Sequence, residues 1–63
     1  MSGFADAIAA HVAASIKFKE LGLNCKDADE AKDWTLASKN EAQAALALVQ
    51  AKKTIDAGYA SKR

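Results

Sequence analysis

The sequence predicts an all-α protein, an antiparallel helical hairpin with unequal arms that self-associates into a helical bundle. Alanine is the commonest of the 63 residues and proline is absent, and these two residues have the highest and the lowest helix propensity. Large apolar side chains recur at helical spacing in two separate segments. Gly22 and Asn24 interrupt the pattern between the segments, where a turn is expected.

The first helix is expected over about residues 4–21. Ser2 is the expected N-cap. Four large apolar residues follow at successive four-residue spacings, which place them on one face of the helix: Phe4, Ile8, Val12 and Ile16. Gly22 is expected to end the helix as a left-handed C′ residue, with Leu23 making the hydrophobic contact that often completes such a cap.

The second helix is expected over about residues 27–57, after a turn at 22–26. Asn24 and Asp27 are both candidate N-caps, and the segment Asp27-Ala28-Asp29-Glu30 resembles a capping box with Asp in place of Ser or Thr. The carboxylates suit the positive end of the helix dipole. Gly58 is the expected stop, and residues 60–63 are expected to be frayed.

One local pattern favours a different arrangement. Ser38-Lys39-Asn40-Glu41 is a capping box followed by an apolar run, so a third helix could begin at about residue 39. The alternative fold is then a three-helix bundle with a break near Ser38. No Gly or Pro separates this box from the preceding helix, which favours one continuous helix. In either case residues 1–63 form a single helical domain.

The unequal arms predict a partner. At 1.5 Å per residue the first arm is about 27 Å long and the second about 46 Å, so the long arm beyond residue 44 has no cover within its own chain. Burying one large aliphatic side chain stabilises by about 1.5–3 kcal/mol. A homodimer is therefore expected. Trp34 is expected to pack against the first helix, and because Trp is a frequent interface hot spot it is also a possible anchor for a larger protein. The predicted interface residues are Trp34, Leu46, Leu48, Val49, Ile55 and Tyr59.

The composition argues against several classes of protein. The net charge is only +1, which gives no global reason to expect binding to nucleic acid or to an anionic membrane. The uncharged runs are shorter than the roughly 20 residues that span a bilayer. No signal-peptide pattern is visible, and Cys25 is the only cysteine, so we expect a cytoplasmic protein without disulfides.

The few candidate catalytic and metal-binding residues form no recognisable site. His11 and Ser15 are one helical turn apart, but a triad also needs a third orienting group and an oxyanion site, so a packed histidine is expected. Four acidic residues near the second helix start do not have the spacing of a calcium-binding EF-hand loop: Asp27, Asp29, Glu30 and Asp33. We therefore expect that the protein is not an enzyme and that it binds no metal and no cofactor.

A candidate basic patch consists of Lys17, Lys19, Lys52 and Lys53. Lysines that flank an aromatic residue, here Phe18, can bind nucleic acid. The hairpin pattern and the segment Asp27-Ala28-Asp29-Glu30 are similar to the Rop family of plasmid copy-number regulators, which are RNA-binding dimers of helical hairpins. The resemblance implies a hairpin dimer. The arms here are unequal, unlike those of that family, and no RNA-contacting residue is carried over.

The expected function is a non-enzymatic protein–protein interaction module. A homodimeric helical hairpin would bind and modulate a larger protein, as accessory or inhibitor proteins of phages and plasmids do. One alternative is a small dimeric regulator that binds nucleic acid. The other is a structural component of a larger assembly such as a virion.

Overall fold

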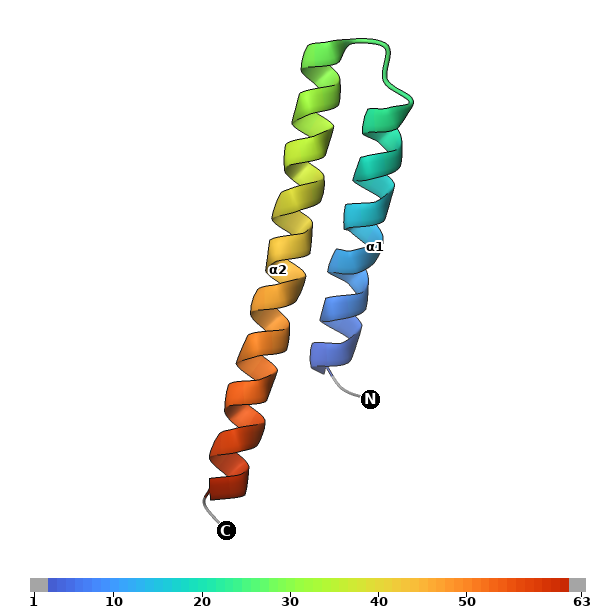
Figure 1. Ribbon diagram of the computed structural model, residues 1–63. Coiled ribbons are helices and arrows are strands. Elements are labelled where there is room, and N and C mark those ends of the chain that lie inside the picture. The colour runs from blue at the N-terminus through green and yellow to red at the C-terminus, as the bar shows by residue number, and fades with distance from the viewer. Residues whose placement is uncertain (1–2, 62–63) are drawn as a thin grey trace.

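The protein is an all-α antiparallel hairpin with unequal arms, as predicted. The computed structural model describes residues 3–61. Helix α1 spans Gly3–Leu23, 21 residues, and helix α2 spans Ala28–Ser61, 34 residues. The two helices lie side by side along the whole of α1, and the C-terminal part of α2 extends beyond it (Figure 1). The molecule is elongated, with extents of 56 × 20 × 10 Å.

The end of α1 differs from the prediction. The helix continues through Gly22, and no glycine among the described residues has a positive φ, so the left-handed C′ assignment was wrong. Gly22 instead lies where the two helices approach closely. A Cβ added there would lie 3.2 Å from the Trp34 Cβ and 3.4 Å from the Ala31 carbonyl oxygen. The glycine therefore serves helix packing rather than chain reversal.

The start of α2 is capped as the sequence indicates. The Asp27 carboxylate accepts a hydrogen bond from the backbone N–H of Asp29 at 3.0 Å. The Asp27 carbonyl accepts one from the N–H of Ala31 at 2.9 Å, which is the first bond of the helix. At its other end α2 runs past Gly58 to Ser61, because one glycine costs a helix only about 1 kcal/mol. Residues 62–63 of the predicted frayed tail lie outside the described residues.

Helix α2 has no break at Ser38, so the three-helix alternative is wrong. The two polar residues of the apparent capping box have other partners. The Ser38 hydroxyl donates to the backbone carbonyl of Ser15 at 2.8 Å, and Glu41 binds His11. Both partners belong to α1. The S-x-x-E pattern thus marks contacts between the helices and not a helix start.

The helices meet along a seam that repeats at alternating spacings of three and four residues, as in a coiled coil. The seam residues of α1 are Phe4, Ile8, His11, Ser15, Phe18 and Gly22, and those of α2 are Ala31, Trp34, Ser38, Glu41, Ala45 and Leu48. Ala45 is the only buried apolar residue in the described part of the chain, at 6% exposure. The other seam residues are half-buried. The hairpin therefore has a seam but no enclosed core, because each helix packs against only one other.

Candidate interaction surfaces

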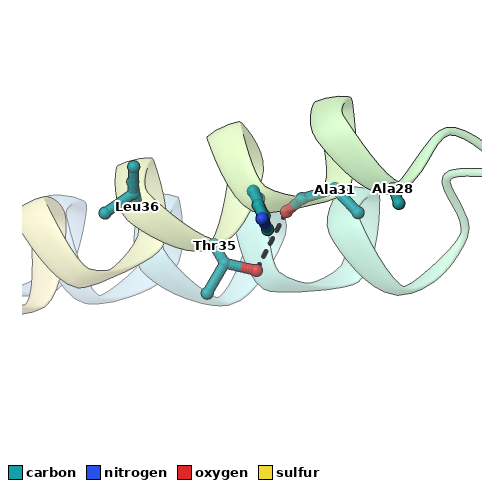
Figure 2. A pocket seen from close by; sticks show the side chains of 5 residues that line it. Ala28, Ala31, Thr35 and Leu36 are labelled. Atoms are coloured by element: carbon teal, nitrogen blue, oxygen red, sulfur yellow. Dashed lines mark hydrogen bonds between the residues drawn. The ribbon is translucent and has the colours of Figure 1, made fainter.

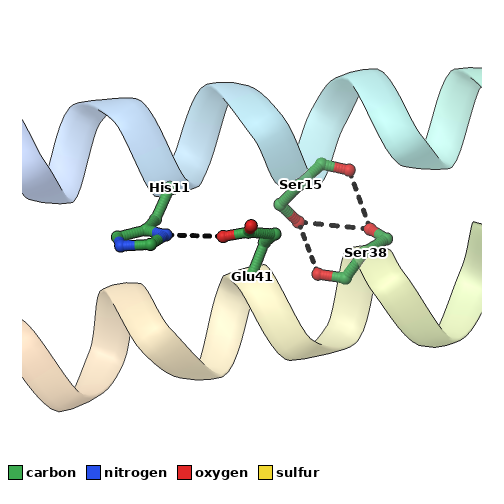
Figure 3. Close-up of polar contacts among 4 residues, drawn as sticks. All are labelled: His11, Ser15, Ser38 and Glu41. Carbon is green, nitrogen blue, oxygen red and sulfur yellow. Dashed lines mark hydrogen bonds and ion pairs between the residues drawn. The ribbon is translucent and has the colours of Figure 1, made fainter.

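Two polar pairs occupy the middle of the seam, where Figure 3 shows four side chains between the helices. His11 hydrogen-bonds through Nδ1 to the Glu41 carboxylate. One turn further along, the Ser15 hydroxyl donates to the Ser38 carbonyl at 3.0 Å, and the Ser38 hydroxyl donates back to Ser15. The two hydroxyl oxygens are 3.2 Å apart. Polar groups therefore fix the register of the two helices at their centre.

His11 and Ser15, which the sequence places one helical turn apart, are a possible base and nucleophile of a catalytic triad. Glu41 supplies the third, orienting group that the sequence did not reveal, because it lies 30 residues from His11. The Ser15 hydroxyl, however, is bonded to Ser38, and no hydrogen bond joins it to His11 among the described residues. A nucleophile needs the histidine as its base. The pairs thus hold the seam together and do not assemble a catalytic triad.

Four acidic residues lie at the start of α2, namely Asp27, Asp29, Glu30 and Asp33. Asp27 is the N-cap of the helix. Within residues 3–61, no group of three or more His, Cys, Asp or Glu side chains is placed to hold a metal ion. Cys25 is half-buried in the turn, and its thiol donates to the Asp27 carbonyl at 3.5 Å. These contacts connect the turn to the first residues of α2.

Trp34 lies in the seam, where its ring packs against Phe18. The ring centroids are 5.5 Å apart and the planes are tilted by 37°. Both rings are half-buried, and such aromatic pairs add about 0.5–1.5 kcal/mol beyond the area they bury. The predicted anchor thus has a partner within its own chain.

The other predicted interface residues fall into two groups. Leu46 and Ile55 are exposed, whereas Leu48 and Val49 are half-buried. Leu48 lines a depression of about 290 Å³ together with three residues from the start of α1: Gly3, Phe4 and Ala7. The Tyr59 side chain lies outside the part of the chain whose side chains are described.

The register of α1 against α2 explains why Leu46 and Ile55 are exposed whereas Leu48 and Val49 are half-buried. Phe18 lies opposite Trp34 and Ser15 opposite Ser38, so Phe4 lies beside about residue 48 and not beside 44. The overhang of α2 is therefore about one turn shorter than predicted, and it begins after Val49. Ile55 belongs to the overhang. Leu46 lies alongside α1 and is exposed because it is on the flank of the seam.

Seven large apolar side chains are exposed in the described part of the chain. They are Val12, Ile16, Leu21 and Leu23 of α1, and Leu36, Leu46 and Ile55 of α2. The exposed fraction of Leu36 is 59%. Exposed apolar side chains of this size are candidates for contact with a partner where they gather on one face.

The predicted basic residues are divided between the two ends of the hairpin. Lys17 and Lys19 are exposed near the turn, and Lys53 is exposed on the overhang. Lys52 pairs with Asp56 at 2.8 Å. From the register, Lys17 and Lys52 are separated by roughly 25 Å along the axis, at about 1.5 Å per residue. The fold does not gather these four lysines into one cluster.

A different pair of lysines does come together. Lys19 of α1 and Lys39 of α2 line one groove of about 390 Å³. The other residues of this groove are Gly22, Leu23, Ala31, Thr35 and Ser38. The sequence alone does not indicate that Lys39 lies near Lys19, because this proximity depends on the register of the two helices.

A second depression lies on α2 alone, with a volume of about 480 Å³ (Figure 2). Its lining residues are Ala28, Ala31, Lys32, Thr35 and Leu36. The Thr35 hydroxyl donates to the Ala31 carbonyl at 2.9 Å, so its hydrogen is already used within the helix. The depression is mainly apolar and open.

Comparison of the chain with protein-family models, with curated proteins and with solved structures finds no significant match. Within the described residues, neither helix contains an apolar stretch that is long enough to cross a membrane.

Proposed function

We propose that the chain is a non-enzymatic interaction module, a helical hairpin that pairs with a second copy and binds a larger protein. One observation carries the proposal. Seven large apolar side chains are exposed among the described residues, whereas Ala45 is the only buried apolar residue. The single chain thus leaves several large apolar side chains in contact with water, where they do not stabilise it.

The magnitudes support a partner. Burying one large aliphatic side chain contributes about 1.5–3 kcal/mol, and small natural domains commonly depend on oligomerisation, a metal or disulfides. The only cysteine cannot form an intrachain disulfide. Covering two of the exposed side chains would add up to about 3–6 kcal/mol, which is comparable with the roughly 3–5 kcal/mol that a single core supplies in a chain this small.

The overhang of α2 is the segment that the second copy covers in this proposal. Ile55 is exposed there, beyond the reach of α1. A second hairpin could supply the helix surface that α1 does not provide at this level. The contact would be made twice in a symmetric dimer.

Sedimentation equilibrium at micromolar concentration tests the pairing. The expected mass is twice the 6.6 kDa of one chain. Ile55→Ser should weaken the association at least tenfold, and Leu36→Ser is the matched control because Leu36 is exposed on α2 but not on the overhang. A monomer at every concentration would refute the pairing.

Co-purification from the native host, analysed by mass spectrometry, tests the second part of the proposal. We expect a protein other than the chain itself in near-stoichiometric amount. The complex should weaken much less with added salt than a phosphate-bound complex does, because apolar contacts carry most of the docking in this proposal whereas phosphate binding weakens steeply. Recovery of the chain only with itself would refute the larger partner.

A further inference from the structure

We propose that one face of the hairpin binds an acidic amphipathic helix of the partner protein. This inference rests on the proposed function and identifies its docking surface. The face is called here the lysine-flanked face. It consists of Val12, Ile16, Lys19 and Leu23 of α1, and of Thr35, Lys39, Ala42 and Leu46 of α2.

The residues of each helix form one stripe. On α1 they follow one another at spacings of four, three and four residues, and the same spacings recur on α2. Positions three and four apart lie on the same side of a helix. Each stripe borders the seam, because Ile16 follows the seam residue Ser15 and Lys39 follows the seam residue Ser38.

The two stripes lie on the same side of the hairpin. Near the turn, Lys19 and Leu23 of α1 line one groove with Thr35 and Lys39 of α2. The helices are antiparallel and stay in contact along α1, so the continuation of one stripe remains beside the continuation of the other. Val12 and Ile16 are thereby placed on the side that also presents Leu46.

The centre of this face is apolar and open. Ile16 is 55% exposed and Leu46 is 56% exposed, and Val12 is exposed as well. Ala42, a small residue, lies between Lys39 and Leu46 in the α2 stripe. A third helix that packs leucine-type side chains against an apolar face of this kind is a common mode of recognition.

The charges favour an acidic occupant. Lys19 and Lys39 are both exposed and line the same groove. None of the described residues that line this groove is Asp or Glu. A partner helix with carboxylates on both sides of its apolar stripe would therefore meet opposite charges at the rim, which favours association and sets orientation.

The same charges disfavour the other occupants. In a symmetric dimer through this face, each copy would bring the same residues to the contact, and these include no Asp or Glu that could pair with Lys19 and Lys39. A nucleic acid would suit Lys19 and Lys39, but it would leave the aliphatic side chains of Ile16 and Leu46 without an apolar partner. An acidic amphipathic helix satisfies both requirements.

A designed peptide provides the test. The probe is a fluorescein-labelled 18-residue helix with leucines at i, i+3, i+4 and i+7 and glutamates beside them, and its control has lysines in place of the glutamates. We expect the acidic peptide to bind the full chain at least tenfold more tightly in fluorescence anisotropy. Ile16→Ser combined with Leu46→Ser should weaken binding at least tenfold.

Matched variants separate this face from the rest of the surface. Leu36→Ser is the apolar control, because Leu36 points away from α1 (Figure 2) and is as exposed as Leu46. Lys19→Glu with Lys39→Glu should weaken binding of the acidic peptide at least tenfold. Lys17→Glu should change it less than twofold, since Lys17 lies outside the stripe. Far-UV circular dichroism verifies that each variant keeps the helical content of the parent chain.

Three outcomes would overturn the assignment: equal binding of the two peptides, an equal loss with Leu36→Ser, or displacement of the acidic peptide by a single-stranded oligonucleotide. If Ile16→Ser with Leu46→Ser converts a dimer to a monomer, the face belongs to the second copy and the assignment also fails. Failure of the peptide experiments with the dimer and the co-purified partner intact would refute only this face. Absence of both the dimer and the partner would refute the proposed function itself.

Discussion

Ser15 and Ser38 bond each other's backbone across the seam. The Ser38 hydroxyl is 2.8 Å from the Ser15 carbonyl oxygen, and the Ser15 hydroxyl is 3.0 Å from the Ser38 carbonyl oxygen. Two small side chains allow the helices to approach closely enough for side chain to reach backbone in both directions. The pair therefore links the two arms at the centre of the hairpin.

Larger side chains at this crossing should separate the helices. We expect Ser38→Ala to lower the free energy of unfolding by about 0.5–1.5 kcal/mol, the usual net value of a hydrogen bond. Ser38→Leu should add about 1–3 kcal/mol for overpacking. Urea unfolding followed by circular dichroism measures both. Thr54→Ala is the control, because Thr54 is exposed on the overhang and its hydroxyl bonds only within α2. Equal stability of Ser38→Leu and the parent chain would contradict the close crossing.

The close approach at Gly22 predicts an unusual response to alanine. Alanine normally stabilises a helix by about 1 kcal/mol relative to glycine. At Gly22 the new Cβ would lie 3.2 Å from the Trp34 Cβ, and crowding of this kind costs about 1–3 kcal/mol. We therefore expect Gly22→Ala to lower the thermal midpoint. Gly58→Ala should raise it, because beyond the local helix backbone no atom of the described residues lies within 4 Å of the added Cβ there. A gain from both substitutions would show that the helices are further apart than described.

The N-cap at Asp27 gives a prediction about local stability. Asp27→Ala removes the acceptor of the Asp29 N–H bond and should cost about 1 kcal/mol in urea unfolding. Asp27→Ser keeps a side-chain oxygen at the cap, so it should retain most of the stability. If serine is as costly as alanine, the carboxylate acts there through its charge and not through the cap.

Local signals in the sequence predicted the two helices and the Asp27 cap, because each depends on residues within a few positions of one another. Relations between the arms were not predictable in this way. Gly22 is one example. The local pattern predicted that it ends the first helix, whereas its small size allows the close approach of Trp34 from the other helix. Glu41 is the example at the centre, since only the register shows that it binds His11.

The register of the two helices also determines which residues of α2 are covered by α1. The predicted overhang began at residue 44, but the close packing of Phe18 on Trp34 shifts α1 along α2 by about one turn. Leu48 therefore contacts the start of α1, and Leu46 moves from the overhang to a flank of the hairpin. The position of Lys39 beside Lys19 follows from the same shift.

The contact between His11 and Glu41 should couple the two arms energetically. Both side chains are partly exposed, so a double-mutant cycle with His11→Ala and Glu41→Ala should give a coupling of about 0.5–1 kcal/mol. Lys52 and Asp56 provide the reference cycle. They are an exposed pair four residues apart on α2, for which about 0.3–0.5 kcal/mol is usual. Glu41→Gln should keep part of the coupling, because an amide oxygen still accepts from the ring N–H. The coupling is measured by urea unfolding at low salt. A value no larger than that of the reference pair would mean that the serine pair alone fixes the register.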